Sequence, residues 1–239
     1  MTALSPQRIV VEAAPRLAEV AAEWLAVAVE AVLRDRGSCS VALSGGETAR
    51  PLYERLAGEP YASRISWRDL DIYFGDERAV PPGDPASNYG MATASLLVRV
   101  PIAPARVHRM EAERADRDAA ARDYERILPG RLDVLLLGMG ADGHTASLFP
   151  GSAAVQERAR RVLPIVGPKP PAERLTITPP VIETARRVAV LVSGTNKAAM
   201  VARALQGPVT PRDLPVQFAL GGTWFLDREA AAGLEGAEP

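Results

Sequence analysis

The 239-residue sequence is poor in several residue types, and each shortage excludes a class of protein. It has a single cysteine, Cys39, so no internal disulfide can form, and we expect this thiol to be a small buried side chain. No apolar run approaches the roughly 20 residues of a membrane-spanning helix. Residues 1–6 lack the charged flank and apolar centre of a secretion signal. We therefore expect a cytoplasmic protein that does not contact the membrane.

Basic segments and metal-ligand patterns are also missing. The formal net charge is -1 and no basic block occurs, so no nucleic-acid partner is expected. Cysteine, histidine and carboxylate residues do not cluster at metal-ligand spacing, which predicts no metal site. The Gly-x-Ser-x-Gly pattern of a hydrolase nucleophile is absent.

Histidine and lysine are scarce, and this scarcity draws attention to the few that occur. The histidines are His108 and His144, and the lysines are Lys169 and Lys197. Every other cation is an arginine, so arginine serves as the ordinary surface cation and both lysines become candidate site residues. For His108 we expect a local hydrogen bond without a chemical role.

Strand-like and helix-like segments alternate along the chain, and hydrophobic residues make up 47% of it. The pattern predicts one α/β domain over residues 1–239, with a doubly wound, mostly parallel sheet and helices on both faces. The C-terminal tail is expected to fray. Predicted strands cover residues 39–43, 71–74, 106–110, 134–137, 161–166, 174–178, 188–192 and 218–225. Predicted helices cover residues 16–34, 48–56, 88–97, 113–127, 179–187 and 198–205.

Residues 133–151 organise the rest of the chain. An apolar run typical of a buried parallel strand ends in a glycine turn that carries Asp142 and His144. Such a turn can hold an acid–base pair in place. The spacing of Gly138, Gly140 and Gly143 also matches a dinucleotide fingerprint. That interpretation is weaker, because no acidic residue follows at the expected distance and Asp142 would repel a pyrophosphate.

Four polar motifs directly follow apolar strands. They cover residues 44–48, 75–78, 138–144 and 193–197. Any one of them could be a bare turn or a solvated salt-bridge cluster. Because ligands of open α/β sheets bind at the carboxyl ends of the strands, we expect all four to surround one site.

The residues of these motifs indicate the class of ligand. Glycine turns, helix N-termini and the cations Arg78, Arg174, Lys169 and Lys197 favour an anion, most simply a phosphate. Lys169 lies in a proline-stiffened loop just before Arg174, which suits an anion clamp. The sequence therefore predicts acid–base chemistry on a phosphorylated small molecule, without a cofactor.

Several of these motifs resemble the 6-phosphogluconolactonase family. They are Leu-Ser-Gly-Gly at 43–46, Gly-Asp-Glu-Arg at 75–78, Ser-Asn-Tyr at 87–89, Gly-Met-Gly-Ala-Asp-Gly-His-Thr-Ala-Ser-Leu-Phe-Pro at 138–150, Pro-Lys-Pro-Pro-Ala-Glu-Arg-Leu-Thr-Ile-Thr at 168–178 and Gly-Thr-Asn-Lys-Ala at 194–198. The resemblance covers nearly the whole chain in order. It implies a Rossmann-like fold related to glucosamine-6-phosphate deaminases. It also implies hydrolysis of 6-phospho-D-glucono-1,5-lactone, a phosphorylated sugar lactone, to 6-phosphogluconate in the pentose phosphate pathway.

The resemblance also suggests roles for individual residues. His144 would be the general base that activates water, Asp142 would orient its imidazole, and Asp76 is the next candidate base. Which residues hold the phosphate and which the sugar stays open. Substrate contacts are expected from Ser44, Gly45, Gly46, Thr48, Arg78, Asn88, Gly140, Lys169, Arg174 and Lys197.

One departure and two rival functions remain. Glu47 stands where the family usually has serine, and a carboxylate there would repel a phosphate.

A deaminase or ketose–aldose isomerase, unlike a lactonase, would use Asp76 as a base on carbon. A sugar-phosphate sensor would share the fold, but no basic helix-turn-helix precedes the first helix. We expect a monomer or a weak oligomer.

Overall fold

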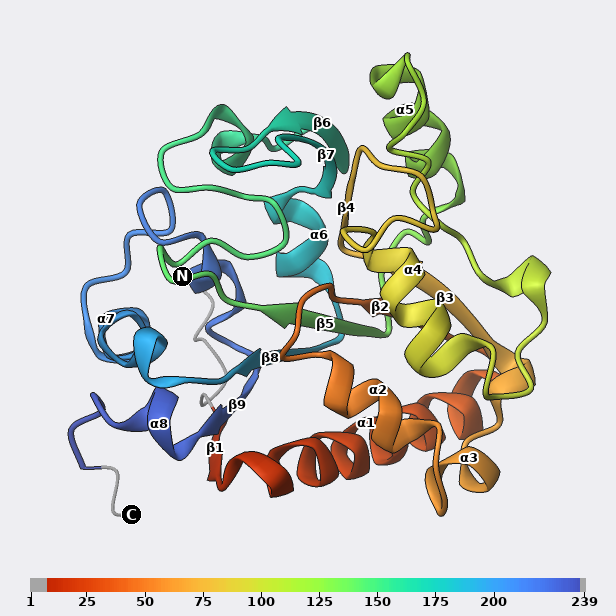
Figure 1. Ribbon diagram of the computed structural model, residues 1–239, viewed down its shortest axis with the longest axis horizontal. Helices are drawn as coiled ribbons and strands as arrows, with labels where there is room; N and C mark the ends of the chain where they lie inside the picture. Colours follow the sequence, from red (N-terminus) through yellow and green to blue (C-terminus); the bar gives the residue numbers. More distant parts are fainter. Residues whose placement is uncertain (1–7, 237–239) are drawn as a thin grey trace.

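The computed structural model describes residues 8–236 and is built around a six-stranded parallel sheet (Figure 1). The strand order is β1-β9-β8-β5-β2-β3, and every neighbouring pair is parallel. The mostly parallel α/β fold is therefore confirmed. The predictions about residues 1–6 and about the last residues of the tail lie outside the described residues. The strands are β1 (Arg8–Glu12), β2 (Cys39–Leu43), β3 (Leu70–Phe74), β5 (Val134–Gly138), β8 (Arg187–Val192) and β9 (Thr223–Asp227).

Helices pack against this sheet and its edges. The long α1 (Ala14–Arg36) contacts β1, β2, β5 and β9, while α6 (Pro179–Thr184) lies on the opposite side of β5 in Figure 1. None of the helices within residues 8–236 combines the length and apolar character that a membrane crossing needs. The remaining α-helices are α2 (Arg50–Leu56), α3 (Tyr61–Arg64), α4 (Asn88–Ala92), α5 (Arg117–Ile127), α7 (Ala198–Gln206) and α8 (Arg228–Ala231).

A second, three-stranded antiparallel sheet was not expected. It consists of β4 (Asp76–Arg78), β7 (Glu173–Ile177) and β6 (Val162–Val166), in the order β4-β7-β6. Residues 75–78 were predicted as a loop and the last two of these strands as part of one sheet. The chain leaves the parallel sheet at Gly75, whose N–H still donates to Leu43 O while its carbonyl already accepts from Ile177 N. Gly75 thus connects the two sheets, and the antiparallel pairing sets Arg78 opposite Arg174.

Other predicted elements differ at their ends. The strand β1 was missed, because five residues with charged ends give a weak apolar signal. Residues 106–110 form only a single bridge, from Val107 to Ile72, after a short 3₁₀ turn. Residues 215–219 are a 3₁₀ turn, so the last strand starts at Thr223 instead of Phe218. The helix predicted over 88–97 becomes π-helical after Ala92.

Cys39 is buried in β2, as the sequence predicts. Burial, with the nearby Asp133 charge, raises the pKa of its thiol to about 12. A thiol with such a pKa stays protonated at neutral pH, which makes it unreactive. It serves as a packing residue of the core.

Candidate active site

A cavity of about 340 Å³ opens where the loops after β2, β3, β5 and β8 meet. The structure therefore brings all four polar motifs to one place. Of the thirteen residues suggested for the site, eleven line this cavity and two, Asp142 and Lys169, do not. The lining residues are Ser44, Gly45, Gly46, Glu47, Thr48, Asp76, Arg78, Asn88, Gly138, Met139, Gly140, His144, Ala146, Arg174 and Lys197.

His144 and Asp142 form a pair at the end of β5. Nδ1 of His144 lies 2.6 Å from Oδ1 of Asp142, and the same oxygen accepts the His144 backbone N–H at 3.2 Å. A proton held on Nδ1 by the carboxylate leaves Nε2 as the basic nitrogen. Burial acts to raise the pKa of Asp142, but its interactions with His144 outweigh burial and hold that pKa below its usual value.

Two glycines make this turn possible. A Cβ on Gly140 would lie 2.0 Å from His144 Nδ1 and 2.5 Å from Asp142 Oδ1, so any side chain there would displace the pair. Gly143 has a φ of +82°, in the region that favours glycine. The turn is closed by the bond from Gly140 N to His144 O, at 2.9 Å. The glycine spacing thus serves the acid–base pair.

Asp76 lies in the cavity wall with both carboxylate oxygens occupied. Asn88 Nδ2 donates to Oδ1 at 3.0 Å, and Ser147 Oγ donates to Oδ2 at 2.5 Å. Arg174 Nη1 in turn donates to Ser147 Oγ at 3.4 Å. Asp76 is only 7% exposed. The hydrogen-bond network fixes its carboxylate between helix α4 and strand β7.

Glu77, the next residue, points to a different environment. Its carboxylate is buried and accepts hydrogen bonds from Ser87 Oγ and from the backbone N–H groups of Arg78, Asn88 and Tyr89. Burial raises the pKa of Glu77, and the backbone donors partly offset that rise. Glu77 therefore anchors the start of α4, where the Ser87 side chain caps the helix by accepting from Gly90 N.

Two arginines on neighbouring strands supply positive charge. Arg174 is buried, and this burial lowers its pKa, with Asp76 opposing and Arg78 reinforcing the effect. Arg78 Nη1 donates to Ala86 O at 2.5 Å, which ties the loop after β4 to the site. Its buried Nε finds no hydrogen-bond partner within residues 8–236. Both guanidinium groups are held by protein contacts before any ligand arrives.

The two lysines occupy different positions. Lys197 Nζ donates to Met139 O at 3.0 Å and lines the cavity beside the His144 turn. Burial lowers its pKa, opposed by the charge of Asp142 and assisted by that of Lys169. Lys169 lies outside the lining, in the loop between β6 and β7, and its carbonyl accepts from Arg174 Nη2 at 3.4 Å.

The unusual Glu47 carries its own counter-ion. Arg50 donates to both carboxylate oxygens, each at 3.1 Å, and this pairing lowers the pKa of Glu47. The Glu47 side chain is 84% exposed. Glu47 thus forms an ion pair with a cation three residues further on. This i,i+3 spacing in the sequence could have indicated the Glu47–Arg50 pair.

Several residues that shape the site were not identified from the sequence. Tyr53 OH donates to Ser44 O at 2.6 Å and accepts from Ser44 N at 2.9 Å, which fixes the glycine loop after β2. Ala146 has a φ of 47°, a conformation that costs a non-glycine residue on the order of 1 kcal/mol. It lies between His144, which lines the cavity, and Ser147, which binds Asp76. Ala146 and Ser147 lie within the dense motif at 138–150, which was their only signal in the sequence, and Tyr53 lies outside it.

His108 lies outside the cavity. Nε2 is 3.0 Å from Asp71 Oδ1, and the ring stacks on Tyr73 with centroids 4.6 Å apart. The local hydrogen bond expected from the sequence is therefore present. This histidine provides a natural comparison for His144.

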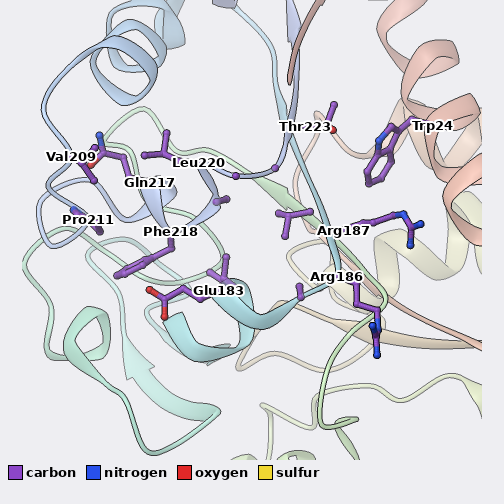
Figure 2. Close-up of a pocket in the computed structure, with 16 residues that line it drawn as sticks. Trp24, Glu183, Arg186, Arg187, Val209, Pro211, Gln217, Phe218, Leu220 and Thr223 are labelled. Carbon is purple, nitrogen blue, oxygen red and sulfur yellow. The ribbon is translucent and has the colours of Figure 1, made fainter. Parts of the chain in front are cut away.

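A larger hollow, of about 580 Å³, lies at the other end of β8 and β9 (Figure 2). Trp24, Arg187 and Phe218 are among its lining residues. Gly221 and Gly222 also line it. Neither histidine and neither lysine of the described chain lines it. It lacks the acid–base pair that the smaller cavity has, so its greater volume does not make it the chemical site.

The fold and the cavity together define an α/β protein with an imidazole–carboxylate pair in an arginine- and lysine-lined pocket. The chain belongs to the family of glucosamine-6-phosphate isomerases and 6-phosphogluconolactonases, whose model matches residues 12–225.

Relatives of known name cover almost all of the chain. The 6-phosphogluconolactonase of Streptomyces coelicolor is 40% identical over 96% of this chain and 95% of its own length. That of Mycobacterium tuberculosis is 40% identical over 91% of this chain and 94% of its own length. The structure of 6-phosphogluconolactonase from Trypanosoma brucei is 31% identical, covers 97% of this chain and 100% of that one, and superposes with a TM-score of 0.85.

A monomeric glucosamine-6-phosphate deaminase has a TM-score of 0.84 at 22% identity, over 95% of this chain and 99% of its own. At that identity the likeness shows a shared fold. The fold is thus common to lactonases and deaminases, and only the site can distinguish between the two chemistries.

Proposed function

We propose that this chain hydrolyses 6-phospho-D-glucono-1,5-lactone to 6-phosphogluconate, with His144 as the general base. The observation that carries the proposal is that His144, paired with Asp142, lines the same cavity as Arg78, Arg174 and Lys197. The two relatives at 40% identity, both named 6-phosphogluconolactonase, support the substrate.

The geometry of the pair supports a general-base mechanism. Asp142 holds the proton on Nδ1 of His144, and Nε2 takes a proton from water as the water oxygen attacks the lactone carbonyl. The negative oxygen of the tetrahedral intermediate is stabilised by nearby cations and backbone N–H groups. When the ring C–O bond breaks, the imidazolium gives its proton to the departing ring oxygen, which becomes a hydroxyl group of the product. No cofactor takes part in any of these steps.

The cations have a separate task in binding. A phosphate carries about two negative charges at neutral pH and is recognised by arginine, lysine and backbone N–H donors. Arg78, Arg174, Lys197 and the glycine loop at 44–48 surround the cavity, and Lys169 lies just outside it. In this proposal they bind the phosphate and the sugar end between them, and the Arg50 guanidinium partly offsets the charge of Glu47.

Asp76 has a supporting role in this proposal. Each oxygen of Asp76 already accepts one hydrogen bond, from Asn88 or from Ser147, which holds the carboxylate in the cavity wall. In this proposal Asp76 supports the site, whereas in isomerase or deaminase chemistry it would be the base on carbon.

A direct test measures lactone hydrolysis against the spontaneous background, in parallel with ammonia release from glucosamine 6-phosphate. We expect the purified protein to accelerate only the first reaction. Acceleration of ammonia release alone would replace the lactonase with a deaminase. Ligand binding without either turnover would favour a sugar-phosphate sensor.

A further inference from the structure

Phe149 follows the His144 turn and contacts two groups of the site without lining the cavity. Its ring centroid is 4.8 Å from that of His144, with the planes tilted by 47°. The guanidinium carbon of Arg174 lies 5.5 Å from the same centroid. Phe149 is only 9% exposed. One buried ring therefore touches both the proposed base and a cation of the anion site.

The same ring supports the loop that carries Lys169. A Cβ on Gly167 would lie 2.8 Å from Phe149 Cε2 and 3.3 Å from Arg174 Nε, so the loop backbone rests directly on both side chains. Arg174 also holds this loop by donating from Nε to Pro171 O at 3.0 Å and from Nη2 to Lys169 O at 3.4 Å. Phe149, Arg174 and the 167–173 loop thus form one packed unit.

His144 depends on such packing for its orientation. The bond to Asp142 fixes one ring nitrogen, but a single hydrogen bond leaves the imidazole free to tilt about it. The backbone of Gly140 limits the ring on the Nδ1 side, and Phe149 contacts it as an aromatic partner. Aromatic pairs prefer defined geometries, so the contact can select one tilt of the imidazole.

We infer that Phe149 is a positioning residue that aligns the imidazole of His144 with the anion-binding unit of Arg174 and the Lys169 loop. The inference rests on the proposed function of His144 and deepens it. Phe149 sets the distance between the group that activates water and the groups that bind the charged end of the substrate. Its loss weakens both functions, through His144 in kcat and through the loop in KM.

Phe149→Leu keeps an apolar side chain but removes the aromatic face, and Phe149→Tyr keeps the face. Phe218→Leu is a matched control, because Phe218 also lies under an arginine, Arg158, at 5.5 Å but lines the other hollow. We expect Phe149→Leu to lower kcat/KM roughly three- to tenfold, the loss of one aromatic contact. Phe149→Tyr should retain most of the wild-type activity, and Phe218→Leu should have unchanged activity.

Two further measurements distinguish positioning from general damage. In a His144→Asn background, Phe149→Leu should change kcat less than twofold while still raising KM, since its effect on kcat runs through the imidazole. The Cε1 proton of His144 should change its NMR chemical shift in Phe149→Leu, while the chemical shift of the His108 Cε1 proton stays fixed.

An undisturbed His144 resonance in Phe149→Leu, or equal losses of kcat with and without His144, would overturn the inference. So would a Phe218→Leu variant that loses as much activity as Phe149→Leu. Because the resonance is read without substrate, it decides the positioning role even if the lactone proves not to be the substrate.

Discussion

Oδ1 of Asp142 contacts His144 twice, through the imidazole Nδ1 at 2.6 Å and through the backbone N–H at 3.2 Å. One carboxylate oxygen thus fixes both the main chain and the ring of the same residue.

Replacing His144 by Asn should remove the proposed base while keeping a side chain of similar polarity. We expect kcat to fall roughly 10²- to 10⁴-fold, the usual span for loss of a general base. His108→Asn is the control and should keep near-wild-type activity, because His108 pairs with Asp71 outside the cavity. Steady-state hydrolysis rates corrected for spontaneous hydrolysis measure both. A loss below tenfold in His144→Asn would transfer the base role to another group, with Asp76 first.

Asp142→Asn should lower kcat by at least about tenfold, because an amide no longer selects the proton on Nδ1 of His144. It should also change the pH dependence of stability. The folded-state pKa of Asp142 is depressed below its ordinary value of about 3.9, so its stabilising contribution is complete above that value. The contribution is lost as the pH falls through the folded pKa. Urea unfolding from pH 7 to 3 should therefore show the two proteins converging at the acid end, and a constant difference would contradict this.

Lys169→Ala should raise KM more than it lowers kcat, since a cation remote from the reacting carbonyl contributes to binding. We expect a KM increase of about tenfold, typical of one lost charge-assisted hydrogen bond. Arg126→Ala removes an exposed cation from α5 and serves as the control. Initial rates over a range of lactone concentrations separate the two constants. A fall in kcat at constant KM would take Lys169 out of the binding role.

Gly140→Ala should damage catalysis through sterics alone. The new methyl group would lie 2.0 Å from His144 Nδ1 and must displace the ring or the turn. We expect kcat to drop roughly tenfold or more, as for a misplaced catalytic group. Gly130→Ala is the matched control, because a Cβ there meets nothing within 4 Å. Activity and Tm should be measured together for both variants. A wild-type kcat in Gly140→Ala would refute the prediction.

The position of the site could be predicted from the sequence alone. Apolar strands that end in polar turns are visible in one dimension, and parallel strands carry their carboxyl ends to one edge. His144, Lys197 and the glycine loop after β2 were therefore expected to meet, and all three line the cavity. The glycine spacing around Gly140 likewise indicated a tight turn, and the structure shows that this turn makes room for the Asp142–His144 pair.

The division of labour between neighbouring residues could not be predicted in this way. Asp76 and Glu77 are adjacent carboxylates, and no local pattern in the sequence shows that their environments differ. In strand β4 their side chains take opposite faces, so Asp76 enters the cavity wall and Glu77 accepts the backbone N–H of Asn88 at the start of α4. A three-residue strand is too short to give a periodic signal, and its partner β7 lies about a hundred residues further on.

The sequence by itself determined which residues lie at the ends of the parallel strands, because each apolar strand and the polar turn after it form a local hydrophobic pattern. What only the tertiary structure decided is how those residues pair. The contact of Ser147 with Asp76 and the packing of Phe149 on Arg174 join segments that are distant in sequence. Such contacts depend on the packing of whole strands and loops, and no local periodicity encodes them.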